Sequence, residues 1–268
     1  MGKHRLAIVG FMIIVLLMVT AALAPILAPW DPANLDLPGN LQGTSFAHPL
    51  GQDKLGRDIL SRIIYGTRIS LKVGVATVSI SLLMGTLIGS IAGYGGRWTD
   101  ETIMRLIDIL MAFPGILLAI AITAVLGPSL NHVILALCLT GWVGYARLIR
   151  GQILSVRDRE YVQAARAIGA GPLRILGRHI LPNTLAPIIV EATFGMAGAI
   201  LAEAGLSFLG LGTQPPTPSW GAMLNEGSHF LLVAPHLTVY PGLAIMLVVL
   251  GFNFLGDGLR DWMDVRKN

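Results

Sequence analysis

Cysteine and charged residues are both scarce in this chain of 268 residues. Cys138 is the only cysteine, which excludes an internal disulfide framework and leaves no cysteine-based metal-site spacing. Charged residues make up 13% of the chain, about half of the roughly 25% typical of soluble domains. Apolar residues make up 54%. This composition excludes a disordered chain and a disulfide-stapled secreted module, and it favours a polytopic membrane protein over a soluble protein with an unusually apolar core.

Six apolar stretches are long enough to cross a bilayer. A hydrocarbon core about 30 Å thick needs roughly 20 apolar helical residues. The first stretch is too long for the 7–15 residues typical of a signal core, and Pro25 would directly follow the cleavage site, so we expect a retained anchor. We predict an all-α polytopic membrane protein with six transmembrane helices, at 6–28, 73–94, 104–126, 132–149, 185–211 and 237–255.

The basic residues indicate the orientation of these helices, because cytoplasmic loops carry an excess of lysine and arginine. With the N-terminus in the cytoplasm, 14 of the 19 basic residues are cytoplasmic: Lys3, Arg5, Arg97, Arg105, Arg147, Arg150, Arg157, Arg159, Arg166, Arg174, Arg178, Arg260, Arg266 and Lys267. The other five lie in an outer segment, where Asp53 and Asp58 can pair with them: Lys54, Arg57, Arg62, Arg68 and Lys72. We therefore expect both termini in the cytoplasm.

The predicted helices divide the chain into three parts. Residues 1–72 comprise a cytoplasmic tail, the first anchor and the outer segment. Residues 73–257 form a core of five transmembrane helices with a long cytoplasmic loop at 150–184, and residues 258–268 form a cytoplasmic tail.

Glycine and proline interrupt two of the apolar stretches. Gly85, Gly89 and Gly93 share one helix face at four-residue spacing, which lets another helix approach closely. That helix can belong to this chain or to a second subunit. Pro114 removes a backbone donor and disturbs the preceding turn. Such an interruption is typical of the broken helices that line transport routes, and it is equally typical of a simple packing kink.

Three acidic residues lie within the predicted spans, where an ionisable group usually faces a partner or a water-filled space. Asp108 is one turn from Arg105, which predicts a local ion pair, and Glu191 is close to the inner surface. Glu203 lies deeper and has no basic neighbour in sequence. We take Glu203, with Asp108 and Pro114, as a candidate for lining a hydrophilic pathway; hydrogen bonding between helices is the alternative for Glu203.

The loop at 150–184 predicts an exposed helical hairpin. Good helix formers occupy 161–168, Gly169 ends that helix, and Pro172 suits the first turn of a second helix that ends before Pro182. An exposed hairpin here indicates a docking surface for a cytoplasmic partner. A DNA-reading helix-turn-helix has a similar turn, but this loop is tied to membrane spans at both ends.

The hairpin resembles the EAA loop of bacterial ABC importer permeases. Gln163 stands where the family has Glu and His179 where it has Ile, and five further positions match at the family's spacing: Ala164, Ala165, Gly169, Leu181 and Pro182. Other segments are similar to the dipeptide, oligopeptide and nickel permeases, and closest to their C-type subunit: 48–62, 204–212, 215–221 and 256–261.

The resemblance implies the six-helix fold of a type I ABC importer permease in the bacterial inner membrane. It also implies a homologous second permease subunit as heterodimer partner, two cytoplasmic ATPase subunits that use ATP and Mg, and an extracytoplasmic substrate-binding protein. The implied function is uptake of di- or oligopeptides, with nickel or another small solute as the alternative. The hairpin residues implied in coupling to the ATPase are Tyr161, Gln163, Ala164, Ala165, Arg166, Ile168, Gly169, Ala170, Leu181 and Pro182.

Other functions are less well supported by the residues. The chain has no Gly-x4-Gly-Lys-Ser/Thr phosphate loop, so we expect no nucleotide chemistry, no catalytic residue and no cofactor in this chain, and no nucleic-acid partner. An intramembrane enzyme would need paired acids, but Glu191 and Glu203 are 12 residues apart, about 120° around a helix. An ion-driven transporter commonly shows repeated halves, and none is visible. His229, His236 and Glu226 do not define a metal site.

Overall fold

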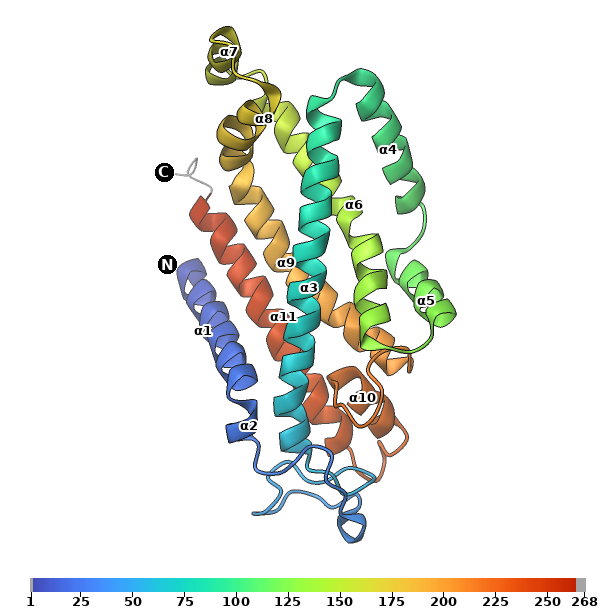
Figure 1. The fold of residues 1–268 in the computed structure, drawn as a ribbon. Coiled ribbons are helices and arrows are strands. Elements are labelled where there is room, and N and C mark those ends of the chain that lie inside the picture. The colour runs from blue at the N-terminus through green and yellow to red at the C-terminus, as the bar shows by residue number, and fades with distance from the viewer. Residues whose placement is uncertain (1, 264–268) are drawn as a thin grey trace.

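The computed structural model describes residues 2–263, and within that range it is built of helices without strands (Figure 1). The long helices are α1 (Gly2–Ala22), α3 (Ile59–Tyr94), α4 (Arg97–Met111), α5 (Gly115–Leu126), α6 (Leu130–Val156), α9 (Leu185–Phe208) and α11 (His236–Met263). The short helices are α2 (Ala24–Leu27), η1 (Leu37–Gly39), α7 (Glu160–Ala167), α8 (Pro172–Ile175), η2 (Leu176–Ile180), η3 (Leu181–Thr184) and α10 (Trp220–Ser228). Arg266 and Lys267, two of the basic residues counted above as cytoplasmic, lie outside the described range.

Five of these helices are long and apolar enough to cross a membrane, and α4 with α5 supplies a sixth crossing if the two are counted as one bent span. The bend between α4 and α5 is 78°. Pro114 causes the interruption, because its ring prevents the preceding residues from continuing the helix. The prediction of an all-α polytopic membrane protein is confirmed, with the third span broken at Pro114.

The second span begins much earlier than predicted. Helix α3 starts at Ile59 rather than near residue 73, and Asp58 caps it by accepting a hydrogen bond from the Ser61 amide at 2.8 Å. Arg62, Arg68 and Lys72 therefore lie in the helix and not in a loop. The expected division at 72/73 also falls inside this helix.

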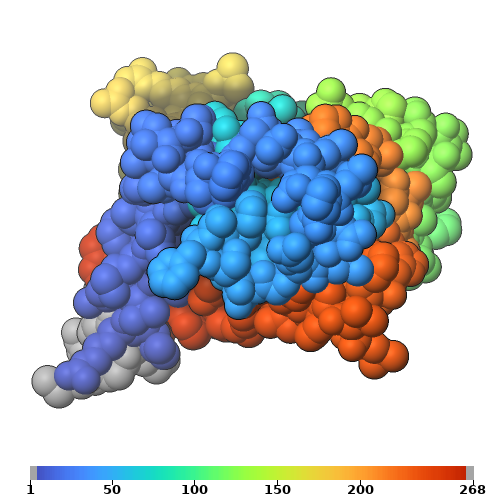
Figure 2. All heavy atoms as spheres, turned by 90° about the horizontal axis from the view of Figure 1, so that it is seen from below, coloured from blue at the N-terminus to red at the C-terminus, as the bar shows by residue number. Residues whose placement is uncertain are grey.

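The bundle has two distinct ends (Figure 1). We call residues 160–184, which contain α7, α8, η2 and η3, the hairpin; it extends beyond one end of the long helices. We call residues 28–58, between α2 and α3, the cap. Figure 2 shows the cap, in blue, spread over the other end of the molecule beside the orange segment that contains α10. The start of α1 and the end of α11 lie side by side on one flank.

Helices α3 and α6 pack in close contact through glycines. A Cβ at Gly85 would lie 2.5 Å from the Tyr145 Cβ, and one at Gly93 would lie 2.9 Å from the Ile153 Cβ. At Gly89 the obstacle is the Ala146 carbonyl oxygen, at 2.6 Å. The glycine face predicted from the sequence thus lies against a helix of the same chain.

We expect Gly89→Ala to lower the stability of the bundle by about 1–3 kcal/mol, because the added methyl group meets rigid backbone. The measurement is the thermal unfolding midpoint of the purified protein in detergent. Gly151→Ala on α6 is the matched control, since nothing lies within 4 Å of its added methyl group and alanine favours a helix. Equal midpoints for the two variants would show that the α3–α6 contact is not tight.

Candidate functional site

The hairpin turns one side of α7 into the protein and exposes the other. Val162 and Ala165 are buried and pack with Ile153, Ile175 and Ile180 in one apolar cluster. Ala165 therefore faces inward, although the sequence suggested that it meets a partner together with Ala164. Of the two alanines, Ala164 is the exposed one.

The tip of the hairpin carries exposed apolar side chains. Ile168 is 84% exposed, Leu173 is 86% exposed, and Tyr161 is 43% exposed. Gly169 forms the turn between Ile168 and Leu173. Its φ of +82° is a left-handed conformation that glycine adopts without strain. Large apolar residues exposed at one site are typical of a protein–protein contact. Leu173 was not among the predicted coupling residues; its place directly after Pro172, in the first turn of α8, was the available signal.

The remaining predicted coupling residues have mixed environments. Gln163 is exposed and donates a hydrogen bond to the Asp158 carbonyl oxygen at 3.1 Å. The Arg166 guanidinium lies 5.4 Å from the centre of the Tyr94 ring at the end of α3, which connects the hairpin to the bundle through a cation–π contact. Ala170 and Leu181 are half-buried, and Pro182 is exposed.

The second helix of the hairpin is less regular than predicted. Only Pro172–Ile175 is α-helical, followed by a π-helical turn at Leu176–Ile180 and a 3₁₀ turn at Leu181–Thr184. Pro182 cannot donate a backbone hydrogen bond, which disfavours a continuous α-helix into α9.

A row of hollows that share lining residues, here called the furrow, follows one side of α9. It consists of three adjoining hollows of about 410, 260 and 660 Å³, in order from the hairpin toward the cap. Glu191 lines both the first and the middle hollow, and Gly198 and Ala202 line both the middle and the last. The furrow thus extends along most of a helix that is long enough to cross the membrane.

The lining of the furrow changes character along its length. Its middle hollow contains hydroxyl and carboxylate groups: Thr77, Ser81, Thr140, Tyr145 and Glu191. Its last hollow is lined mainly by apolar side chains, including Ile116, Leu201, Phe208, Leu224 and Ile245. An exposed carboxylate facing lipid is unfavourable, so the polar part of this surface is expected to meet water or protein.

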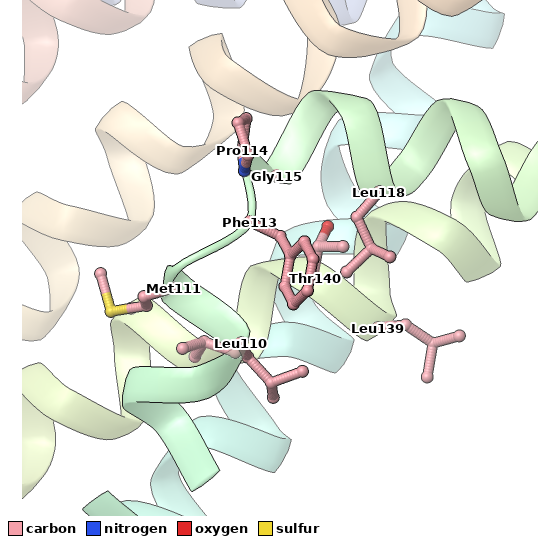
Figure 3. A pocket seen from close by; sticks show the side chains of 10 residues that line it. Leu110, Met111, Phe113, Pro114, Gly115, Leu118, Leu139 and Thr140 are labelled. Atoms are coloured by element: carbon pink, nitrogen blue, oxygen red, sulfur yellow. The ribbon is translucent and has the colours of Figure 1, made fainter. Parts of the chain in front are cut away.

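The break between α4 and α5 borders the furrow. A hollow of about 350 Å³ lies at the break and shares Thr140 and Gly144 with the middle hollow. Figure 3 shows the labelled side chains around it, with Leu110 at the end of α4 and Leu118 on α5. The predicted pathway residue Pro114 is therefore at the edge of the furrow and not remote from it.

Glu203 does not line the furrow. Its side chain is completely buried, and one carboxylate oxygen accepts a hydrogen bond from the Ser207 hydroxyl at 2.6 Å. Ser219, the N-cap residue of α10, lies beside the same carboxylate. The described contacts place Glu203 in the packing of α9 against its neighbours rather than on an open surface.

The predicted pair between Asp108 and Arg105 is wrong. Asp108 pairs with Arg147 of α6, while Arg105 contacts Glu101 at 3.4 Å on its own helix. The Arg150 guanidinium and the Asp100 carboxylate, 2.6 Å apart, form a second link. These pairs join α4 to α6, which sequence proximity along one helix could not indicate.

The cap is fastened by buried charges. Asp53 accepts hydrogen bonds at 2.7 Å from both Arg57 and Arg62, and Glu226 of α10 lies 2.7 Å from Arg57 and 3.4 Å from Arg62. The expected pairing of Asp53 is confirmed. Asp58 instead contacts His48 at 2.9 Å, and the role of Glu226 was missed because it lies far along the chain.

Two of the three residues considered above as metal ligands, Glu226 and His236, have other partners in the structure. Glu226 is engaged by two arginines, and the His236 imidazole lies 3.5 Å from the Gln52 carbonyl oxygen. In residues 2–263, no group of three or more histidine, cysteine or acidic side chains is arranged to hold a metal ion.

Comparison with known families agrees with this architecture. Residues 85–268 match the family described as binding-protein-dependent transport system inner membrane component. Residues 2–49 match the N-terminal transmembrane domain of oligopeptide transport permease C. Together the two matches cover most of the chain.

Relatives with similar sequences are transport permeases. A dipeptide transport system permease protein of Alkalihalophilus pseudofirmus is 50% identical over 262 residues, which cover 98% of this chain and 86% of that protein. A glutathione transport system permease protein of Escherichia coli O157:H7 is 48% identical over 263 residues, covering 98% and 87%. The corresponding protein of Pectobacterium atrosepticum is 46% identical with the same coverage.

A solved structure has the same fold. A chain of the methionine ABC transporter MetNI, in an inward-facing form, superimposes with a TM-score of 0.62 at 18% identity, covering 76% of this chain and 97% of that chain. With the family matches and relatives above, the assignment follows: the chain belongs to the binding-protein-dependent transport system inner membrane components and is a C-type ABC importer permease of the bacterial inner membrane.

Proposed function

We propose that this chain forms half of the membrane pathway of an importer of di- and oligopeptides. Separate ATPase subunits drive it through the hairpin, a second permease subunit completes the pathway, and an extracytoplasmic binding protein delivers the peptide. The observation that carries the proposal is the furrow along α9, because a half-conduit must be open on one side until its partner covers it. The hairpin lies in the cytoplasm in this account, and the cap lies outside.

The mechanism is alternating access. ATP binding by the partner subunits draws the two permease hairpins together and opens the pathway outward, and hydrolysis resets it inward. In this chain, such a movement reaches α3 through the contact of Arg166 with the Tyr94 ring. It reaches the rest of the bundle through the apolar contacts of Val162 and Ala165.

Peptides are favoured as substrates because one relative is a dipeptide permease and another is a permease for glutathione, itself a tripeptide. Nickel is the alternative within the same family. Calorimetric titration of the cognate binding protein with dialanine, trialanine, glutathione and nickel chloride separates these substrates. We expect binding of dialanine or trialanine. Binding of nickel alone would overturn the peptide assignment, and binding of glutathione alone would narrow it.

The docking role of the hairpin is testable at its tip. We expect the double variant Ile168→Glu, Leu173→Glu to reduce co-purification of the ATPase subunits about tenfold or more, because exposed apolar residues at the centre of a contact dominate its affinity. Leu35→Glu is the control, since Leu35 is 58% exposed but lies in the cap. Undiminished co-purification would assign docking to another surface.

A further inference from the structure

The middle hollow of the furrow contains polar groups that the account above does not use. Ser81 and Tyr145 are buried, with 1% and 7% of their surface exposed. Their hydroxyl oxygens have no hydrogen-bond partner among the described residues. A buried hydroxyl without a partner is unfavourable. Because both oxygens are closed off from solvent in this conformation, they can take a partner from outside the chain only when the helices around the hollow move apart.

A carboxylate lies at the same place. Glu191 is exposed, lines the same hollow, and lies within electrostatic range of the Tyr145 hydroxyl. Its presence on a membrane-spanning helix needs a compensating cation or water, and Arg260 of α11 lines the hairpin-side hollow together with it. The hydroxyl of Tyr145 reaches α9 because Gly195 has no side chain; a Cβ there would lie 2.0 Å from the hydroxyl oxygen.

These groups match one ligand chemistry. A primary ammonium group has three donors and no acceptor. The hollow offers the exposed Glu191 carboxylate, and the two hydroxyl oxygens behind its surface become acceptors once the surrounding helices move apart. We propose that Glu191, Tyr145 and Ser81 form a transient site for the α-ammonium group of the peptide as it passes along the furrow. The inference rests on the proposed function, because it assigns a subsite to the substrate of that pathway.

The position suits a step in transport. The hollow lies between the mainly apolar hollow on the cap side and the hollow that Glu191 shares on the hairpin side. A peptide moving from the cap toward the hairpin would leave apolar surface and meet this carboxylate. An inorganic cation such as Na⁺ could satisfy the same oxygen atoms, so the test distinguishes the two sources of positive charge.

The test is saturation-transfer difference NMR on the purified permease–ATPase complex without binding protein, because this method detects weak ligand contacts. The probes are dialanine and N-propionyl-alanine, which lacks the ammonium group, each in sodium chloride and in choline chloride. We expect a dialanine signal that falls about tenfold in Glu191→Gln, the loss typical of a charge-assisted hydrogen bond, and a smaller loss in Tyr145→Phe. N-propionyl-alanine should give a weak signal that neither substitution changes.

Glu101→Gln is the matched control, because Glu101 is exposed on α4 and lies outside the furrow. Gel filtration of each complex confirms that the subunits stay assembled. An equal dialanine signal in wild type and Glu191→Gln would overturn the inference, and so would loss of the signal in sodium relative to choline, which would assign the site to an inorganic cation.

Uptake by the complete importer separates failure of this inference from failure of the proposed function. If wild type and Glu191→Gln both import dialanine at the same rate, the peptide pathway stands and the ammonium site is wrong. If wild type imports no dialanine and gives no signal, both are wrong.

Discussion

Replacing Asp53 by Asn is expected to lower the unfolding free energy by about 3–5 kcal/mol, the loss typical when one partner of a buried ion pair is removed. Asp53 is 5% exposed and is the shared acceptor of Arg57 and Arg62. Without its charge, two buried guanidinium groups remain with only Glu226 between them. The cap should then separate from the ends of α3 and α10.

Thermal unfolding of the purified permease, followed by tryptophan fluorescence, measures this effect. Asp31→Asn is the matched control, because Asp31 is an exposed residue of the same cap whose side chain accepts a hydrogen bond from the Ala33 amide. We expect the control to change the midpoint little. An Asp53→Asn protein as stable as the control would mean that the arginines are solvated and that the buried network does not fasten the cap.

Replacing Gly169 by Val is expected to abolish uptake while leaving the amount of permease in the membrane unchanged. Gly169 has a φ of +82°, and a β-branched residue is strongly disfavoured there. The turn would have to open, which displaces Ile168 and Leu173 relative to each other. Because the hairpin tip is exposed, the bundle itself should still fold, and the defect should appear as ATP hydrolysis without transport or as loss of the ATPase subunits.

Gly171→Val provides a closely matched comparison. Gly171 lies in the same turn, also with nothing within 4 Å of an added Cβ, but its φ of −69° is allowed for valine. We expect this variant to keep at least about half of the wild-type uptake, because no backbone change is required. Similar losses in both variants would show that bulk on the hairpin surface, and not the left-handed turn, is what transport cannot tolerate.

Much of the fold could be predicted from hydropathy, and the errors of that prediction have a physical reason. The apolar stretches could be found because each membrane-spanning helix must itself be long and apolar enough to cross the hydrocarbon core, whatever its neighbours are. The first fourteen residues of α3 were assigned to a loop because they contain Arg62, Arg68 and Lys72. Asp53 at 2.7 Å and Glu226 at 3.4 Å compensate the charge of Arg62 beneath the cap, and a hydropathy window scores the arginine without these partners.

The candidate site was predictable only where local chemistry defines it. Gly169 and Pro172 predict the hairpin turn, because their backbone preferences act regardless of the surroundings. The furrow depends instead on which side of α9 the other helices leave uncovered. Glu203 looked suitable for a pathway because it is deep in an apolar span, yet it is buried, whereas Glu191, twelve residues earlier, lies on the open side.

The central claim is that this chain conducts peptide only as part of an ATP-driven complex. The direct measurement is uptake of radiolabelled dialanine into proteoliposomes that contain both permease subunits, with binding protein outside and ATP inside. We predict accumulation with the ATPase subunits present and none when they are omitted or when ATP is replaced by a non-hydrolysable analogue. Uptake by the permease chains alone, or ATP hydrolysis stimulated by loaded binding protein without any uptake, would contradict the account.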